Sequence, residues 1–280
     1  MEQIKLDALR EAARKIRVGI IEGTHAAKSG HPGGSLSIAD IMAYLYFEEM
    51  NIDPKNPKDP TRDRFVLSKG HTAPALYAAL AERGFFDKEE LKTLRKIDSR
   101  LQGHPDMKGI PGVDMTTGSL GLGISAACGM ALSAKITGKS YYTYTILGDG
   151  ECEEGQVWEA AMFAAHHKLD NLVGMVDWNG QQIDGKVDEV GGVGDLEAKF
   201  KAFGWDVIVA DGHDFEEILK AYAKADEACG NGKPVMILFK SDMGHGVDFM
   251  AGTHAWHGKA PSAEQCANAL AQLEETLGDF

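Results

Sequence analysis

Apolar and polar residues along this chain fall into short β-like runs separated by stretches with helical periodicity. The β-like runs predict strands at residues 65–68, 141–147, 172–177, 205–210 and 234–239. The helical spacing predicts helices at residues 5–28, 37–50, 74–83, 88–95, 119–137, 153–167 and 262–277. We place the start of the second helix at Ser37, because serine is a favourable N-cap residue.

The order of these elements predicts the fold class. Strands that alternate with helices indicate an α/β protein with a doubly wound, mostly parallel sheet and helices on both faces. The Pro-rich segment 53–60 is the one candidate boundary, but a strand-like run follows it at once. We therefore interpret it as an ordered surface loop, and we expect a single domain over residues 1–280.

The bulk composition restricts the partners of the chain. Apolar residues make up 44% and charged residues 25% of its 280 residues, as in ordinary soluble proteins. The net charge of −13 argues against a nucleic-acid partner and against an anionic membrane surface. No apolar run approaches the roughly 20 residues that span a bilayer. The four cysteines are scattered without a CxxC pair, so we expect a cytoplasmic protein with reduced thiols.

Polar residues and glycines follow the predicted strands at the positions where α/β sheets bind ligands. These positions lie beyond the carboxyl ends of the strands. Three of the four segments there combine glycine with polar side chains suited to a site; the segments are 69–71, 148–150, 179–181 and 241–246. Because several independent loops converge on one edge of the sheet, the sequence predicts a site at that edge.

Asp149 stands between two glycines, which permit a tight turn and a close approach of the backbone to a ligand. Its carboxylate and the carboxamide of Asn179 are hard oxygen donors suited to Mg²⁺ or Ca²⁺, and the backbone carbonyl of Gln181 is a candidate third donor. The alternative is that both segments are plain turns, since Asn-Gly is a common turn dipeptide. The flanking strands favour a metal site that bridges to a diphosphate.

Several histidines stand in Gly-rich, non-helical segments, namely His31, His71, His104 and His257. Loops of this kind present side chains to ligands, and imidazoles exchange protons near neutral pH or donate to phosphate and hydroxyl oxygens. A single histidine is more often a surface or core residue, so the hypothesis rests on the cluster.

Two further candidates have ordinary structural explanations. The segment 116–123 opens a predicted helix with free N–H groups that suit an anion, although small residues also permit close helix packing. Glu154 opens the helix after Asp149, where an acidic residue complements the helix dipole.

Taken together, these segments resemble the signature blocks of the transketolase family, in order and over residues 10–265. The blocks are Ser29 to Gly34, Arg62 to His71, Gly103 to Pro105, Thr117 to Gly121, Gly148 to Gly150 with Asn179, and Trp256 to Pro261. The resemblance implies a diphosphate-binding domain for thiamine diphosphate and a divalent metal, Mg²⁺ with Ca²⁺ or Mn²⁺ as substitutes. It also implies transfer of a two-carbon ketol unit from a ketose, such as a sugar phosphate, to an aldose.

The resemblance also implies roles for individual residues. It makes Asp149, Asn179 and the Gln181 carbonyl the metal ligands. It places the following residues against the cofactor: His71, Gly118, Ser119, Leu120, Gly150, Asn179 and His257. It makes His31, His104 and His257 the groups that contact cofactor or sugar hydroxyls and move protons, with His257 favoured over His254. Glu154 gains a role in a relay across the subunit interface.

Complete transketolases resemble this chain only in their first part. The resemblance therefore implies the N-terminal subunit of a split transketolase, inactive until it pairs with a separate C-terminal subunit, in an α2β2 assembly. The aminopyrimidine-binding and C-terminal domains would belong to that partner.

One block departs from the family pattern. Met243 and His245 stand where the family has two basic residues, which raises the prospect of an unusual ketose substrate. Other interpretations are the α half of a 2-oxo acid dehydrogenase, a deoxyxylulose-phosphate synthase-like protein, or a degenerate relative that binds a partner but no cofactor. The intact Asp149, Asn179 and His71 argue against the last interpretation.

Overall fold

The computed structural model describes residues 2–278, so residues 1, 279 and 280 of the predicted domain lie outside the described part. The helices are α1 (Glu2–Ala27), α2 (Pro32–Leu36), α3 (Ala39–Tyr44), α4 (Ala73–Arg83), α5 (Leu122–Thr137), α6 (Gly155–His166), α7 (Val187–Val190), α8 (Leu196–Ala202), α9 (Phe215–Ala228) and α10 (Ala263–Thr276). The strands are β1 (Arg64–Leu67), β2 (Thr143–Gly148), β3 (Leu172–Trp178), β4 (Gln181–Gln182), β5 (Gly185–Lys186), β6 (Asp206–Asp211) and β7 (Val235–Lys240). Short helical turns η1 to η5 occupy Leu45–Glu49, Gly70–Thr72, Lys88–Thr93, Gly150–Glu153 and His254–Trp256.

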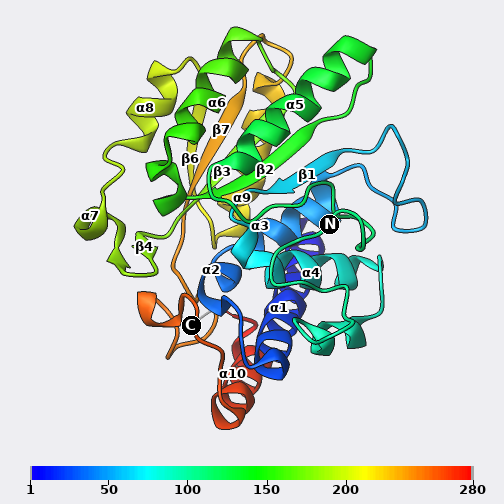
Figure 1. The fold of residues 1–280 in the computed structure, drawn as a ribbon, viewed down its shortest axis with the longest axis vertical. Coiled ribbons are helices and arrows are strands. Elements are labelled where there is room, and N and C mark those ends of the chain that lie inside the picture. Colours follow the sequence, from blue (N-terminus) through cyan, green and yellow to red (C-terminus); the bar gives the residue numbers. More distant parts are fainter. Residues whose placement is uncertain (1, 279–280) are drawn as a thin grey trace.

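The main sheet has the strand order β1-β2-β3-β7-β6, and every neighbouring pair is parallel. The chain moves outward from β1 to β3, skips one position to β6, and then returns to place β7 between β3 and β6. Right-handed crossovers therefore put α9, which connects β6 to β7, on the face opposite to α5, α6 and α8 (Figure 1). The predicted doubly wound α/β fold is confirmed.

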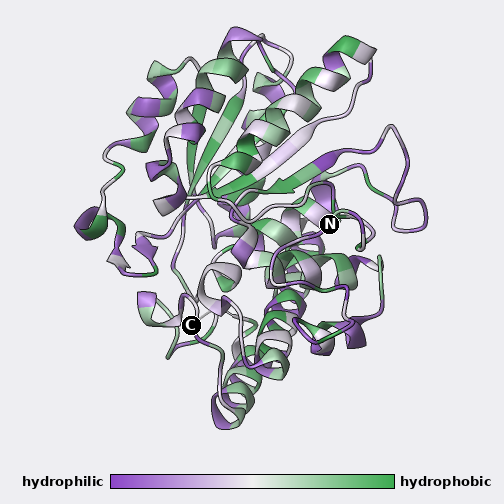
Figure 2. Ribbon diagram, viewed as in Figure 1, coloured by the Kyte–Doolittle hydropathy of each residue, from purple (hydrophilic) through white to green (hydrophobic). Residues whose placement is uncertain are grey.

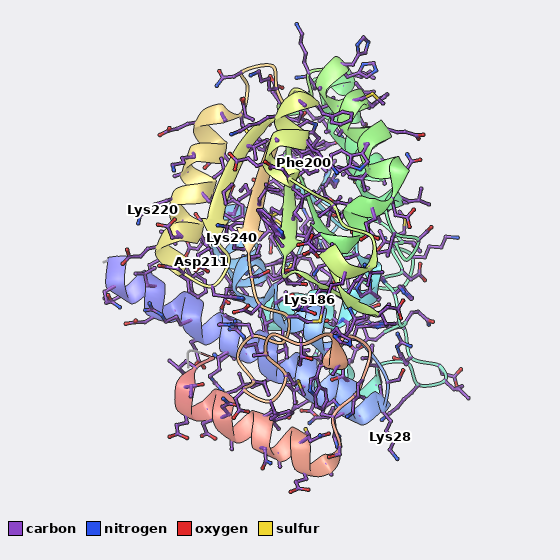
Figure 3. All side chains as sticks on the ribbon, turned by 90° about the vertical axis from the view of Figure 1, so that its left-hand side faces the viewer. Lys28, Lys186, Phe200, Asp211, Lys220 and Lys240 are labelled. Atoms are coloured by element: carbon purple, nitrogen blue, oxygen red, sulfur yellow. The ribbon has the colours of Figure 1, made fainter. Side chains whose placement is uncertain are left out.

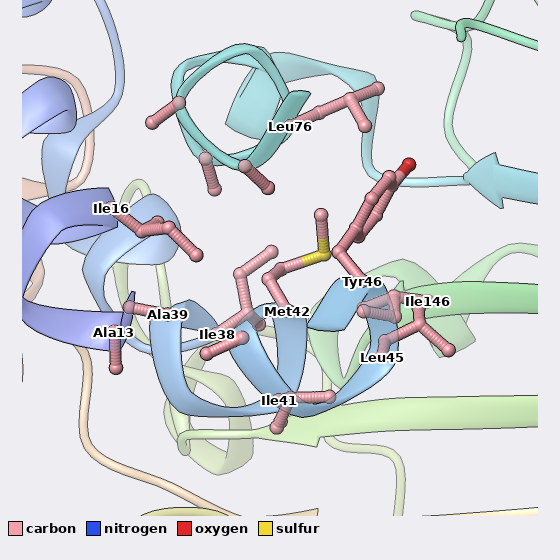
Figure 4. Packing of buried hydrophobic residues seen from close by; sticks show 14 of the residues in the cluster. Ala13, Ile16, Ile38, Ala39, Ile41, Met42, Leu45, Tyr46, Leu76 and Ile146 are labelled. Atoms are coloured by element: carbon pink, nitrogen blue, oxygen red, sulfur yellow. The ribbon is translucent and has the colours of Figure 1, made fainter. Parts of the chain in front are cut away.

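Each face of the sheet builds its own hydrophobic core. Adjacent residues of a strand alternate between the two: Ile146 and Met175 belong to the core under α1, α3, α4 and α9, whereas Leu147 and Val176 belong to the core under α5, α6 and α8. The strands are accordingly mostly apolar, as expected of a sheet covered on both faces (Figure 2). Figure 4 shows α3 lying between Ile16 of α1, Leu76 of α4 and Ile146 of β2.

A helical layer below the sheet supports the loops at its carboxyl edge. The long helix α1 packs against α3, α4 and α10, and it runs side by side with α10 in Figures 1 and 3. Arg17 of α1 is fully buried and forms a bidentate ion pair with Asp40 of α3, at 2.9 Å and 2.5 Å. Within residues 2–278, no helix is long and apolar enough to cross a membrane.

The predicted helix at residues 37–50 is wrong in its start and its continuity. The structure has α2, which begins at Pro32, then α3, then the π-helical turn η1. Proline suits the first turn of a helix, because its missing N–H is not needed there. Ser37 is therefore not an N-cap; its Oγ donates to Asp177 Oδ2 at 2.6 Å.

Two other helices differ from their predicted bounds. The segment predicted as a helix at 88–95 is the 3₁₀ turn η3, and it cannot continue because Arg95 has a φ of 58°. Helix α5 begins at Leu122 and not at residue 119, because Gly121 adopts a left-handed φ of 80°. Gly121 also lies so close to Glu154 that a Cβ would approach the Glu154 Cβ to 2.8 Å.

Candidate active site

A cavity of about 280 Å³ lies at the carboxyl edge of the sheet, where the loops after β1, β2, β3 and β7 meet. The predicted site residues that line it are His31, His71, Gly118, Leu120, Asp149, Gly150, Asn179, Gln181 and His257. The parallel sheet explains this convergence, because all its strands end at the same edge.

Asp149 follows β2 and is almost completely buried, with 2% of its surface exposed. Its Oδ1 accepts a hydrogen bond from the Gly150 N–H at 2.8 Å, and its Oδ2 accepts one from the Gly180 N–H at 2.6 Å. Burial, together with the nearby negative charge of Asp177, raises the pKa of Asp149 to about 7. A cation at this position would keep the carboxylate ionised, since an opposite charge stabilises the charged form.

Asn179 follows β3, and its carboxamide is held at both ends. Its Oδ1 accepts from the Gln181 N–H at 2.9 Å, and its Nδ2 donates to Asp177 Oδ2 at 2.8 Å. Because Asp149 also contacts the Gly180 N–H, the two predicted oxygen donors belong to one hydrogen-bonded unit. Gln181 opens the β4–β5 hairpin beside them.

The loop histidines form a cluster in the cavity wall. The His31 ring lies 5.1 Å from that of His71 and 5.5 Å from that of His257, between ring centroids. His71 and His257 stack with their centroids 5.1 Å apart. Burial is the main cause that lowers the pKa of His31 and His257 to about 4 and that of His71 well below its ordinary value. The cluster is therefore neutral at pH 7.

The residues present fit a metal–diphosphate cofactor. Nδ1 of His31 and Nδ1 of His257 are buried and have no hydrogen-bond partner among the described protein atoms. A carboxylate has about four lone-pair sites, so Asp149 retains acceptors after its two backbone hydrogen bonds. The oxygen donors of Asp149 and Asn179 match the ligand preference of Mg²⁺, Mn²⁺ and Ca²⁺.

Three predicted site residues lie outside the cavity lining. Ser119 lines a neighbouring surface pocket with Gly118. His104 is exposed and packs its ring against Gly118, where a Cβ would meet it at 3.3 Å. Glu154 is exposed and stands at the start of α6 without a side-chain capping hydrogen bond.

Sequence reasoning missed three buried polar residues at this edge. Lys69 lines the cavity and donates from Nζ to Asp177 Oδ2 at 2.5 Å. Glu151 accepts from Ser68 Oγ at 2.5 Å and from the Gly121 N–H at 2.8 Å. Lys69 and Glu151 stand next to predicted site residues in the sequence but were not themselves predicted as site residues. Asp177 lies within a predicted strand.

Met243 and His245, the two residues that depart from the family pattern, lie in different environments. Met243 lines the cavity with 1% of its surface exposed and packs against Gly33, where a Cβ would lie 2.9 Å from Met243 Cγ. His245 instead stacks on His213 outside the cavity lining, with ring centroids 3.5 Å apart. Burial and His213 lower the pKa of His245 to about 3, so it supplies no positive charge at pH 7. His257 lines the cavity and the exposed His254 does not.

Asp40, His213 and His245 present possible metal-ligand atoms within 4.8 Å of one another. Asp40 is already held by Arg17, and His213 uses Nδ1 for Asp40 at 2.9 Å and Nε2 for the Asp242 N–H at 2.9 Å. We therefore assign no metal to this group, which instead anchors the loop that carries Met243.

Comparisons with known proteins agree with this geometry. Residues 8–278 match the family model described as transketolase, thiamine diphosphate binding domain. The chain is 47% identical to the 6-deoxy-6-sulfo-D-fructose transketolase subunit SqwG of Clostridium sp. (strain MSTE9), covering 98% of this chain and 99% of that subunit. It is 39% identical to a subunit of the apulose-4-phosphate transketolase of Phocaeicola vulgatus, covering 98% and 96% of the two chains.

Longer relatives match over less than half of their length. The chain is 44% identical to human transketolase, with 97% of this chain and 42% of that protein covered. The solved structure of transketolase from Leishmania mexicana superimposes with a TM-score of 0.89 at 34% identity, with 95% of this chain and 41% of that chain covered. The chain therefore belongs to the transketolase family, whose thiamine diphosphate binding domain it matches.

Proposed function

We propose that this chain is the N-terminal subunit of a thiamine diphosphate-dependent transketolase, which transfers a two-carbon ketol unit from a ketose to an aldose. The observation that carries the proposal is the convergence of Asp149, Asn179 and the histidine cluster on one cavity. When bound, thiamine diphosphate supplies a nucleophilic carbon and an electron sink for the cleavage of a carbon–carbon bond. The chain itself would hold the diphosphate end and move protons.

In this proposal the metal is Mg²⁺, which Ca²⁺ or Mn²⁺ can replace. Asp149, the Asn179 carboxamide and the Gln181 carbonyl would bind it, and diphosphate oxygens and water would complete its coordination. The cation would compensate the raised pKa of Asp149 and keep that carboxylate ionised. His71, Gly118, Ser119, Leu120, Gly150 and His257 would contact the cofactor.

The histidines would serve as proton acceptors and donors for sugar hydroxyls. Neutral His31 and His257 can each accept a proton at pH 7, because burial keeps their pKa at about 4. Their Nδ1 atoms are buried and have no hydrogen-bond partner among the described protein atoms, so a bound ligand can supply that partner. His104 would act from the rim of the site, and Glu154 through a contact with the partner.

A C-terminal subunit would complete the active site. The two relatives matched over almost their whole length are named as transketolase subunits, and human transketolase is more than twice as long as this chain. We propose that residues 1–280 form the diphosphate-binding domain, and that a partner carries the aminopyrimidine-binding and C-terminal domains in an α2β2 assembly. The four cysteines are all free, which supports our proposal of a cytoplasmic location.

The substrates would be a sugar, in the first instance a sugar phosphate of pentose phosphate metabolism, and an aldose acceptor. The relatives named above act, by their names, on 6-deoxy-6-sulfo-D-fructose and on apulose 4-phosphate. Met243 lines the cavity wall where the family pattern has a basic residue, so ketoses other than the usual sugar phosphates belong in the first substrate panel.

The test is a ketol-transfer assay of the purified chain, alone and mixed with a candidate C-terminal subunit, with thiamine diphosphate and Mg²⁺. The donor panel contains fructose 6-phosphate, xylulose 5-phosphate and the two unusual ketoses. We expect turnover only with the partner. Robust turnover by the chain alone would contradict the split-enzyme proposal, and release of CO₂ from pyruvate without ketol transfer would indicate the 2-oxo acid or deoxyxylulose-phosphate chemistry instead.

A further inference from the structure

A single carboxylate behind the cavity connects three of the loops that build it. Asp177, the penultimate residue of β3, is completely buried. It accepts hydrogen bonds from Lys69 Nζ after β1 at 2.5 Å, Ser37 Oγ at 2.6 Å, Asn179 Nδ2 at 2.8 Å, and Ser241 Oγ after β7. Three of these donors share Oδ2 and the fourth binds Oδ1, so four hydrogen bonds hold this carboxylate in place.

The chemistry of an ionised carboxylate decides which way the Asn179 carboxamide faces. Such a carboxylate only accepts hydrogen bonds, so the amide NH₂ and not the amide oxygen must point toward Asp177. The oxygen, Asn179 Oδ1, is then turned to the other side, where it accepts from the Gln181 N–H at 2.9 Å. That side is the cavity side, since Asn179 and Gln181 both line the cavity.

The same carboxylate fixes a positive charge in the cavity wall. Lys69 is 2% exposed, and its ammonium group is held by Asp177 Oδ2 and by the Gly34 carbonyl at 3.0 Å. The ammonium group has three N–H donors, and these two contacts account for two of them. The ion pair is buried on both sides, with 3% and 0% of the side chains exposed.

Stability alone does not explain such an arrangement. Removing two charges from water is costly, and an apolar pair of similar volume is often as stable as a buried ion pair. The network does specify geometry, because it determines the orientation of Asn179 and the place of Lys69 at once. Groups that orient metal ligands from behind typically change metal affinity or activity by about 10- to 100-fold when they are removed.

We propose that Asp177 is a positioning residue, which directs the Asn179 oxygen toward the metal and holds Lys69 at the cavity wall. This inference rests on the proposed function, because it assumes a cation bound by Asp149 and Asn179. Asp177 itself would not touch the cation, since its oxygens already accept from four donors.

The test compares Asp177→Asn with the wild-type full chain in the binding of Mn²⁺ and thiamine diphosphate, measured by calorimetry and by the electron paramagnetic resonance of free Mn²⁺. An asparagine can present its own NH₂ to Asn179, so the orientation of that carboxamide is no longer fixed. We expect Mn²⁺ affinity to fall by about 10- to 100-fold. The matched control is Asp63→Asn. Asp63 is another buried carboxylate, but it lies at the amino ends of the strands, where it accepts from the Asn51 and Tyr142 N–H groups.

Thermal unfolding without metal separates positioning from stability. We expect both variants to unfold at lower temperatures than the wild type, but only Asp177→Asn to lose Mn²⁺ affinity. Equal Mn²⁺ affinity in folded Asp177→Asn and wild type would overturn the inference. Failure of the wild type to bind Mn²⁺ and thiamine diphosphate even together with the C-terminal subunit would instead count against the proposed function.

A second variant keeps the inference testable if Asp177→Asn does not fold. A carboxylate is by itself a better Mg²⁺ or Mn²⁺ ligand than a carboxamide, so Asn179→Asp should improve binding if residue 179 acts alone. With Asp177 behind it, the new carboxylate has no NH₂ to donate and meets a like charge. We therefore expect Asn179→Asp to bind Mn²⁺ weaker than the wild type by about 10-fold or more, and tighter binding would overturn the inference.

Discussion

His71 and His257 lie face to face in the cavity wall, with their ring centroids 5.1 Å apart and their planes inclined by 28°. They come from distant parts of the sequence, one after β1 and the other directly after the 3₁₀ turn η5. Burial lowers the pKa of both rings, so the pair stacks without repulsion between two positive charges at neutral pH. The stack therefore places His257, a potential proton acceptor, against His71, which we expect to contact the cofactor.

Replacement of His257 tests whether this ring moves a proton. We expect His257→Gln, in the complex with the C-terminal partner, to lower kcat/KM for ketol transfer by about 100-fold, which is a typical loss for a general acid or base. The matched control is His254→Gln, since His254 is exposed in the adjoining turn η5 and does not line the cavity. An equal loss in the two variants would contradict the assignment.

Removal of the metal tests the oxygen donors. A ligand at 100 times its Kd stabilises a protein by about 2.7 kcal/mol, so thiamine diphosphate with Mg²⁺ should raise Tm by several degrees. We expect EDTA to abolish this shift, and Asp149→Asn to abolish it even with excess Mg²⁺. Asp184→Asn, an exposed change in the adjacent hairpin, should leave it intact. A shift that persists in Asp149→Asn would rule out this residue as a ligand.

The fold could be predicted from the sequence because its strongest signals are local. Each strand of the main sheet is an apolar run, and the predicted runs overlap all its strands within two residues at each end. The helix bounds were harder, because they depend on tertiary contacts: Ser37 looks like an N-cap until Asp177, distant in sequence, takes its hydroxyl. Likewise, the conformation of Gly121 delays the start of α5.

The candidate site could be predicted only in part for the same reason. Glycines next to Asp149, Asn179 and His71 marked these residues, and the structure brings them to one cavity. Lys69 was marked only through its neighbours Gly70 and His71, and Asp177 lies within a predicted strand and was not singled out. Their importance becomes visible only when the parallel sheet places the end of β3 behind the loop after β1.

Met243 offers a test of charge in the cavity. Met243 is buried and lines the cavity. Its replacement by lysine would restore the basic residue that the family pattern has at this position. We expect Met243→Lys to lower the free energy of unfolding of the free chain by about 1–3 kcal/mol, because it buries a cation near Lys69. We also expect thiamine diphosphate with Mg²⁺ to stabilise this variant more than the wild type. Scanning fluorimetry with and without the cofactor measures both effects.

The control for this change is Met243→Gln, which is polar but uncharged. It should lose stability without gaining a larger response to the cofactor. If the response of Met243→Lys were no larger than that of Met243→Gln, residue 243 would not face the diphosphate.

Far from the cavity, Glu49 forms a half-buried acidic group near the amino ends of the strands. Its Oε1 accepts from the Tyr144 hydroxyl at 2.8 Å. Burial is the main cause that raises its pKa from 4.5 to about 7, and Asp226 contributes by its negative charge. Burial also raises the pKa of Asp226.

This group predicts how stability depends on pH. Between pH 4.5 and 7 the folded state binds more protons at Glu49 than the unfolded state, so the free energy of unfolding falls as the pH rises through this window. Glu49→Gln keeps the acceptor for Tyr144 and does not titrate. We expect it to match the wild type at pH 4, below the window, and to exceed it at pH 8 by on the order of 2 kcal/mol, after discounting for partial exposure. Urea unfolding at the two pH values measures the difference. The control is Glu48→Gln, which breaks the half-exposed ion pair with Lys5 and should change the free energy of unfolding by less than about 1 kcal/mol at both pH values. A pH-independent effect of Glu49→Gln would show that Glu49 is not protonated in the folded protein.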